Sequence, residues 1–334
     1  MKMKDVAERA GVSLTTVSRV LNGSQIVQPA YRERVLRAIA ELEYKPNRLA
    51  SNLRRQKAEM LGVVISDVAD SHFAQLLRAI EDCAYQQGYR VLLCNTDETV
   101  EKQSAYLEIL LAERVSGVLI SPIDPGDPQI SKLLDTGIPV IALDRKVHDP
   151  RADAILVNNF AAAQQATQHL IEQGHTRIAL IAGTPTLQTG AERAAGYEQT
   201  MRAAHLEPSI LGEHFTAEHG QAVTELLLGA SSAPTALVIA NNLLAIGVLR
   251  ALHRHHCRIP ADIALVVIDD PFWVSLVNPP LTALAHPIQL MAQNAVELLQ
   301  ERVQGKRSEP KHNTFDFELH VRDSSLSKTL QPPV

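Results

Sequence analysis

The side chains best suited to recognition chemistry near the start of the chain are hydroxyls and one arginine, in the stretch "GVSLTTVSRVLNG" at residues 11–23. Residues 1–60 carry 12 Lys and Arg against 6 Asp and Glu, although the whole chain has a net charge of −5. A basic head on an acidic body indicates a polyanionic partner at one end of the molecule. Chance clustering of basic residues on a solvated face is the plainer alternative.

Three short helices are predicted to position these side chains. The first spans Lys4–Ala10 and ends at Gly11, the second begins after the N-cap Ser13, and the third begins at Pro29 and runs to about residue 44. Two helices joined by a tight Gly-Val-Ser turn form a helix-turn-helix. The following segment, "YKPNRLASNLRRQKAEM" at residues 44–60, is predicted to be a linker that folds only on a partner.

From residue 61 onward, short apolar runs alternate with helical stretches, in two similar rounds. "LGVVISD", "YRVLLCN", "GVLIS" and "IPVIALD" form the first round, and "RIALIAG", "TALVIA" and "IALVVID" the second; "TFDFELHV" is predicted as a last strand. Continuous Val, Ile and Leu runs are typical of parallel strands covered by helices on both faces. The sequence therefore predicts two α/β lobes, with a ligand site at the carboxyl ends of the strands in the cleft between them.

Composition limits the class of protein. A chain of 334 residues is long enough for two or three domains. Its three cysteines form no CxxC pair, which favours a reducing compartment, and neither a signal peptide nor a membrane-spanning run is present. We therefore expect a cytoplasmic protein without disulfides.

Motifs along essentially the whole chain resemble the lactose/purine repressor family of bacterial transcription regulators. They are "KDVAERAGVSLTTVSRVLNG", "RVLRAIAELEYKPNRLASNLRR", "HLIEQGHTRIALIAG", "ERAAGYEQTM", "IPADIALVVIDD", "PPLTALAHP" and "ELHVRDSS". The resemblance implies an all-α helix-turn-helix head plus an α/β body of two parallel-sheet lobes, similar to periplasmic binding proteins.

The implied domains are a DNA-binding head at 1–45, a hinge helix or linker at 46–59, and an effector-binding and dimerisation domain at 60–334. Within the last, the N-lobe takes about 60–158 and 288–316, and the C-lobe about 159–287 and 317–330.

The resemblance makes the helix from Leu14 to Asn22 the recognition helix, whose first residues meet base edges in the major groove. Leu14, Thr15 and Arg19 lie on one side of it, and Arg19 is the best candidate for bidentate reading of a guanine. Ser13, Thr16 and Asn22 are expected to contact phosphates or cap helices. An Arg19 that touches only phosphate is the alternative.

In the hinge, Leu53 lies at the family's wedge position, where an apolar side chain enters the minor groove and kinks the duplex. Arg54 is expected to follow it into the groove, and Arg55 to stay near the phosphate backbone. Alternatively, Leu53 only packs the linker onto the body.

The same resemblance implies eight effector-binding positions in the cleft. An arginine fork at Arg193 suits adjacent hydroxyls or a carboxylate, and the aromatic rings suit stacking on a ligand. The expected residues are His72, Phe73, Asn158, Thr189, Arg193, Phe215, Asn242 and Trp273. "DSHF" at residues 70–73 replaces the commoner Asn-Pro-Phe-Phe, and Trp273 is as readily explained as a lobe-edge residue.

Two amides stand where the family usually has acids. Asn158-Asn159 replaces Asp-Asn, and Asn241-Asn242 replaces Asn-Asp. Fewer carboxylates beside Arg193 predict a less negative cleft, in which an anionic ligand such as a sugar acid is tolerated. A neutral sugar is an equal alternative, and a purine or nucleoside a weaker one.

The expected function is thus a non-enzymatic DNA-binding regulator, a repressor, acting as a homodimer on double-stranded, pseudo-palindromic operator DNA. Its effector is expected to be a sugar or sugar acid, with a purine-responsive regulator or a transport-type sugar-binding protein as alternatives. No catalytic motif of the GxGxxG, GxxxxGK[ST] or GxSxG type occurs, and no cofactor, metal or membrane partner is expected. "HRHHCRIP" at 253–260 could suggest a metal site, but cationic side chains also suit the helix end predicted there.

Overall fold

The computed structural model describes residues 3–21, 27–42 and 59–326. The chain divides into two units, Met1–Ala58 and Glu59–Val334, and each is described by itself. Within the described ranges, no helix combines the length and the apolar character needed to cross a membrane.

The first unit contains the three predicted helices, α1 (Met3–Ala10), α2 (Leu14–Leu21) and α3 (Pro29–Glu41). Their core consists of small and β-branched side chains, mainly Val6, Val17, Val20 and Val35. The turn between α1 and α2 depends on Gly11, which has a left-handed φ of 62° and whose carbonyl accepts a hydrogen bond from Arg34 Nη2 at 3.2 Å. The predicted helix-turn-helix is confirmed over the described residues.

The first lobe of the second unit is a six-stranded, wholly parallel sheet in the order β11-β5-β4-β3-β1-β2. Two pairs of helices cover it: α5 and α12 pack on one face, and α6 and α7 on the other. The strands are β1 (Met60–Ile65), β2 (Arg90–Asn95), β3 (Gly117–Ile120), β4 (Val140–Leu143), β5 (Asp153–Val157) and β11 (His312–Phe315). The helices are α5 (Ser71–Gln86), α6 (Val100–Ala112), α7 (Pro128–Asp135) and α12 (Ile288–Val303).

The second lobe repeats this plan, with the order β12-β10-β9-β8-β6-β7. Only the pairing of β12 with β10 is antiparallel among the strand pairs described. The strands are β6 (Ile178–Ile181), β7 (Ile210–Leu211), β8 (Ala236–Ile239), β9 (Ala264–Ile268), β10 (Thr282–Ala285) and β12 (Glu318–His320). The helices are α8 (Asn159–Glu172), α9 (Gln188–Ala203), α10 (Ala217–Leu228) and α11 (Asn242–Arg254), with short 3-10 turns η1 (Phe272–Ser275) and η2 (Asp323–Ser325).

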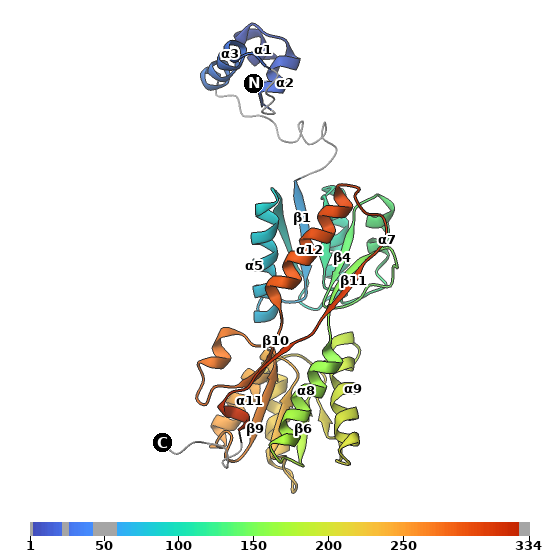
Figure 1. Ribbon diagram of the computed structural model, residues 1–334, viewed down its shortest axis with the longest axis vertical. Helices are drawn as coiled ribbons and strands as arrows, with labels where there is room; N and C mark the ends of the chain where they lie inside the picture. Colours follow the sequence, from blue (N-terminus) through green and yellow to red (C-terminus); the bar gives the residue numbers. More distant parts are fainter. Residues whose placement is uncertain (1–2, 22–26, 43–58, 327–334) are drawn as a thin grey trace. The chain divides into compact units, whose positions relative to one another are not determined.

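The chain crosses between the lobes three times, from β5 to α8, from β10 to α12 and from β11 to β12 (Figure 1). The prediction of one continuous last strand at "TFDFELHV" is wrong, because the strand is interrupted in the middle. Asp316 and Phe317 separate β11, which is parallel in the first sheet, from β12, which is antiparallel in the second. β5, β7 and β10 were not predicted, because β5 has only "ILV" as a run of large apolar residues, β7 has only two residues and "LTALA" lacks a continuous run of large apolar residues.

Candidate functional site

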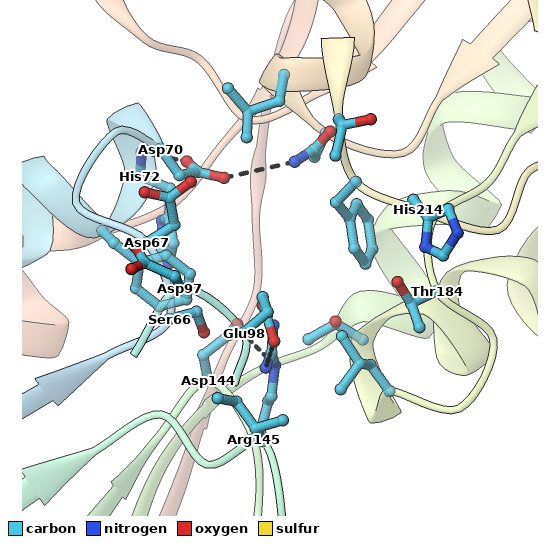
Figure 2. A pocket seen from close by; sticks show the side chains of 18 of the residues that line it. Ser66, Asp67, Asp70, His72, Asp97, Glu98, Asp144, Arg145, Thr184 and His214 are labelled. Carbon is cyan, nitrogen blue, oxygen red and sulfur yellow. Dashed lines mark hydrogen bonds and ion pairs between the residues drawn. The ribbon is translucent and has the colours of Figure 1, made fainter. Parts of the chain in front are cut away.

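A cavity of about 610 Å³ lies between the two lobes, where the strands of both sheets end. Ser66 and Asp67 follow β1, Asp144 and Arg145 follow β4, and Asp269 follows β9. Thr184 and His214 line the cavity from the second lobe and face the acidic residues of the first (Figure 2). This is the position that parallel α/β sheets use for ligands.

The cavity wall is acidic. Six carboxylates line it, those of Asp67, Asp70, Asp97, Glu98, Asp144 and Asp269, against the guanidinium groups of Arg145 and Arg193. Glu98 already pairs with Arg145 through two hydrogen bonds, at 2.8 and 3.1 Å. Carboxylates therefore outnumber guanidinium groups along the wall, which does not support the anionic ligand expected from the two amides.

Three buried polar atoms of this wall have no hydrogen-bond partner among the described residues. They are Ser66 Oγ, Asp144 Oδ1 and Arg145 Nε. Arg145 is only 5% exposed and its remaining nitrogens are held by Glu98 and the Pro122 carbonyl. A buried polar atom without a partner costs about 1–3 kcal/mol, so these atoms are suited to a ligand that both donates and accepts hydrogen bonds.

Backbone strain is concentrated at the same wall. Asp97, Glu98, Asp144 and Asp269 have left-handed φ values of 50°, 52°, 61° and 87°. Such conformations are uncommon for residues other than glycine and persist where the surrounding structure holds them, often at binding sites.

Five of the eight predicted effector residues line the cavity: His72, Phe73, Thr189, Arg193 and Phe215. Arg193 is held in place from the second lobe, because its Nε donates to Asn159 Oδ1 at 2.8 Å and its Nη1 to the Ala240 carbonyl. Phe215 lies directly on Gly183, where a Cβ would come within 2.1 Å of the ring. Glycine at position 183 thus makes room for this aromatic wall.

The other three predicted residues do not line the cavity. Asn158 caps α8, since its Oδ1 accepts from Ala161 N at 3.1 Å and its Nδ2 donates to Asp316. Asn242 is fully buried beneath the wall, and Trp273 packs partly buried on the core from η1. For Asn158 and Asn242, local hydrogen bonding takes the place of the expected ligand contact.

Asn242 joins a buried polar cluster between the lobes. Its Nδ2 donates to Asp70 Oδ1 of the first lobe at 2.8 Å and to Asp269 Oδ2 of the second at 3.0 Å. Asp269 Oδ1 also accepts a hydrogen bond from His286 Nε2 at 2.8 Å. One amide therefore connects two carboxylates of different lobes.

The protonation of this cluster follows from its burial. Burial, and secondly the charge of Asp269, raise the pKa of Asp70. Burial also lowers the pKa of His286 to about 4, so that its ring is neutral at neutral pH. Burial is the largest single influence and would raise the pKa of Asp269, but the hydrogen bond from His286 and the charges of His286, Arg193 and His72 together hold that pKa below its usual range.

The most informative wall residues, Asp70, Asp144, Arg145 and Asp269, were not predicted from sequence. The signal was available, because "ALDRK" and "VVIDD" place acids directly after buried strands. The rule that ligands bind at the carboxyl ends of parallel strands points to these positions.

In the head, Leu14, Thr15 and Arg19 are exposed on α2, whereas Val17 and Val20 are buried. Arg19 has no ion pair or hydrogen bond with any described residue, which leaves its guanidinium available. Ser13 Oγ accepts from Thr16 N at 3.1 Å and lies 2.9 Å from Thr16 Oγ1, so both residues act at the start of the helix. Asn22, Leu53, Arg54 and Arg55 lie outside the described residues, and their roles stay predictions.

Comparisons with known proteins agree along the whole chain. Residues 2–47 match the sequence family "Bacterial regulatory proteins, lacI family", and residues 167–325 match "Periplasmic binding protein-like domain". The HTH-type transcriptional repressor PurR of Aliivibrio fischeri (strain MJ11) is 34% identical over 333 residues, covering 98% of each chain.

Solved structures give the same result. A lac repressor dimer bound to operator and the anti-inducer ONPF superposes with a TM-score of 0.87 at 32% identity, over 98% of this chain and 99% of that one. A complex of the transcriptional regulator CelR with cellobiose gives a TM-score of 0.74 at 31% identity, over 97% and 99%. With its helix-turn-helix head and its two lobes around an acidic cavity, the chain belongs to the lacI family of bacterial regulatory proteins and is a DNA-binding transcriptional repressor.

Proposed function

We propose that a neutral sugar binds in the cavity between the lobes and controls the affinity of this repressor for its operator. The observation that carries the proposal is a group of three buried atoms on the first-lobe wall that have no hydrogen-bond partner among the described residues: Ser66 Oγ, Asp144 Oδ1 and Arg145 Nε, the last of which lies 4.0 Å from Asp144 Oδ2. A sugar hydroxyl donates one hydrogen bond and accepts others, so adjacent hydroxyls can satisfy a carboxylate and a guanidinium together. Phe73 and Phe215 supply apolar faces for the ring of the sugar.

The charge of the wall argues against an anionic effector. Six carboxylates line the cavity against two guanidinium groups, and one of these two, that of Arg145, is already paired with Glu98. Bringing a further carboxylate into this site would bury like charges together, which is costly. A purine also matches the wall less well, because it has fewer hydrogen-bond donors than a sugar has hydroxyls; the similarity to proteins named PurR is the reason to test purines.

On the DNA side, we propose a homodimer that binds a pseudo-palindromic operator through two copies of α2. The exposed Leu14, Thr15 and Arg19 would face base edges, and Ser13 and Thr16 would lie near phosphates. The structure of the operator-bound lac repressor dimer is a precedent for this arrangement. Leu53 and Arg54 would enter the minor groove at the centre of the site.

Coupling between the two sites would operate through the relative position of the lobes. A sugar that contacts Asp144 on the first lobe and Arg193 on the second stabilises the relative position of the lobes in which both contacts form. The hydrogen bond between Asp70 and Asn242 also acts on the relative position of the lobes. Such coupling is typically 1–3 kcal/mol, or roughly 5–150-fold in operator affinity, and it is reciprocal.

The test is direct binding by calorimetry, with matched pairs of neutral sugars and their sugar acids and with purine bases. We expect a neutral sugar to bind. Asp144→Asn should lower the affinity for this sugar by roughly 10–150-fold, because a hydrogen bond to a charged group is lost. Asp82→Asn serves as the control, because Asp82 is an exposed carboxylate on α5 paired with Arg78. Preferential binding of a sugar acid or a purine, or equal effects of the two variants, would contradict the proposal.

A further inference from the structure

We propose a second binding site, for a divalent transition-metal ion of the Zn²⁺ type, formed by His72, Asp269 and His286 between the lobes. One ligand atom of each residue lies within 4.8 Å of the others. Two imidazoles and a carboxylate are a common ligand set for Zn²⁺ and similar ions. This site was not predicted from the sequence, because the three residues are far apart along the chain.

The unpartnered nitrogens are the first reason for the proposal. His72 is only 7% exposed, yet neither of its ring nitrogens has a hydrogen-bond partner among the described residues. The same is true of His286 Nδ1. Buried imidazole nitrogens are normally satisfied, so three such atoms in one place point to a bound ligand.

A separate small cavity is the second reason. It measures about 40 Å³ and is bounded by His72, Asp269 and His286 together with Gln75 and Ile288. This volume holds an ion and a water molecule that completes a four-coordinate shell. A surface groove that includes Gln75, His286 and Ile288 adjoins it and provides access from solvent.

The surroundings suit a metal site. Asp269 Oδ2 is fixed by hydrogen bonds from the backbone and side-chain nitrogens of Asn242, both at 3.0 Å, which orients the carboxylate. The rings of Phe73 and Phe317 flank the two imidazoles, with centroids 5.1 Å from His72 and 4.3 Å from His286. Oriented ligands within an apolar shell are typical of metal centres.

Binding requires a local adjustment. The two imidazoles stack with centroids 3.9 Å apart, so their nitrogens lie side by side, whereas tetrahedral ligand atoms are about 3.4 Å apart and point at the ion. His72 can turn out of the stack because none of the residues that the structure describes forms a hydrogen bond with its ring. A cation would then connect α5 of the first lobe, the loop after β9 of the second and the crossing segment before α12, and would favour this arrangement of the lobes.

The experiment is a titration of the full chain, without affinity tag and stripped of metal, with Co²⁺. Visible absorption and calorimetry are the two readouts of binding. We expect one tightly bound Co²⁺ per chain, displaced by Zn²⁺. His286→Gln and, separately, His72→Gln should weaken binding by about 100-fold or more, since even residues that only orient metal ligands contribute 10–100-fold.

The control is the double substitution His255→Gln and His256→Gln, which removes exposed histidines at the end of α11 and should leave tight binding unchanged. Absence of tight Co²⁺ or Zn²⁺ binding by the unmodified protein would overturn the proposal, whatever the stability of the variants. Loss of binding in the control, or its persistence in both His286→Gln and His72→Gln, would also overturn it.

Discussion

At the scale of single residues, recognition depends on side chains whose hydrogen-bonding atoms are left unused by the fold. Asp144 and Arg145 have such atoms in the cavity, and Arg19 has them on the surface of the head. Arg193 could be predicted from sequence because it lies in the family motif "ERAAGYEQTM", and Phe215 because the resemblance implies an aromatic residue at its position. Asn158 could not be placed correctly, because an asparagine before a helix serves equally well as a cap, and the sequence does not distinguish the two roles.

Replacing Arg19 with Ala should relax the sequence preference of the head. A bidentate arginine–guanine pair contributes about 1–3 kcal/mol of discrimination, so preference at one base pair of each half-site should fall roughly 5–150-fold. The measurement is a comparison of binding to the operator and to single-base variants at fixed salt.

Arg37→Ala is the matched control for charge, because Arg37 is exposed on α3 and paired with Glu33. An equal loss of affinity on every sequence for Arg19→Ala would show that Arg19 contacts only phosphate.

At the scale of elements, a hydrogen bond between the lobes joins the start of α5 to the start of α11, which is itself bonded to the loop after β9. Asp70 caps α5 by accepting from His72 N at 2.8 Å, and Asn242 begins α11 and donates to Asp70. By the family resemblance, an amide is expected at the position of Asp70 and an acid at that of Asn242. The first departure adds a carboxylate and the second removes one, and together they exchange donor and acceptor across the lobes.

Replacing Asn242 with Asp should therefore destabilise the lobes. The new carboxylate would lie between Asp70 and Asp269 without a donor, at a cost of about 3 kcal/mol, typical of an uncompensated buried charge. Thermal unfolding should show this destabilisation of the body as a lower Tm of the Asn242→Asp variant.

The double variant Asp70→Asn with Asn242→Asp restores one amide and one acid across the lobes and should recover most of the loss. If the double variant is as unstable as the sum of the two single variants, the Asp70–Asn242 interaction does not connect the lobes as described.

At the scale of the whole molecule, the two lobes are similar in plan and joined by three crossings. The alternation of apolar runs and helices predicted both sheets, because buried parallel strands consist of continuous Val, Ile and Leu. It did not predict how β11 and β12 divide between the sheets, because that division depends on long-range pairing with β5 and β10. Periodicity along the chain contains no information about such partners.

The stability of the body should fall as the pH falls through about 6.5. Burial lowers the pKa of His169 and of His175 below the ordinary value of 6.5. The unfolded chain then binds more protons than the folded chain, so the free energy of unfolding decreases on acidification. His169→Gln should make this dependence less steep in denaturation series at several pH values, whereas His253→Gln, at an exposed position of α11, should not change it.

Whether the cavity controls the head is tested by measuring operator binding of the full chain. Fluorescence anisotropy of labelled operator gives the affinity with and without the sugar identified by calorimetry. We expect the sugar to change operator affinity by roughly 5–150-fold, and Asp144→Asn to shift this response to roughly 10–150-fold higher sugar concentrations. A sugar that binds in the cavity but leaves operator affinity unchanged would contradict the claim that the cavity controls the head.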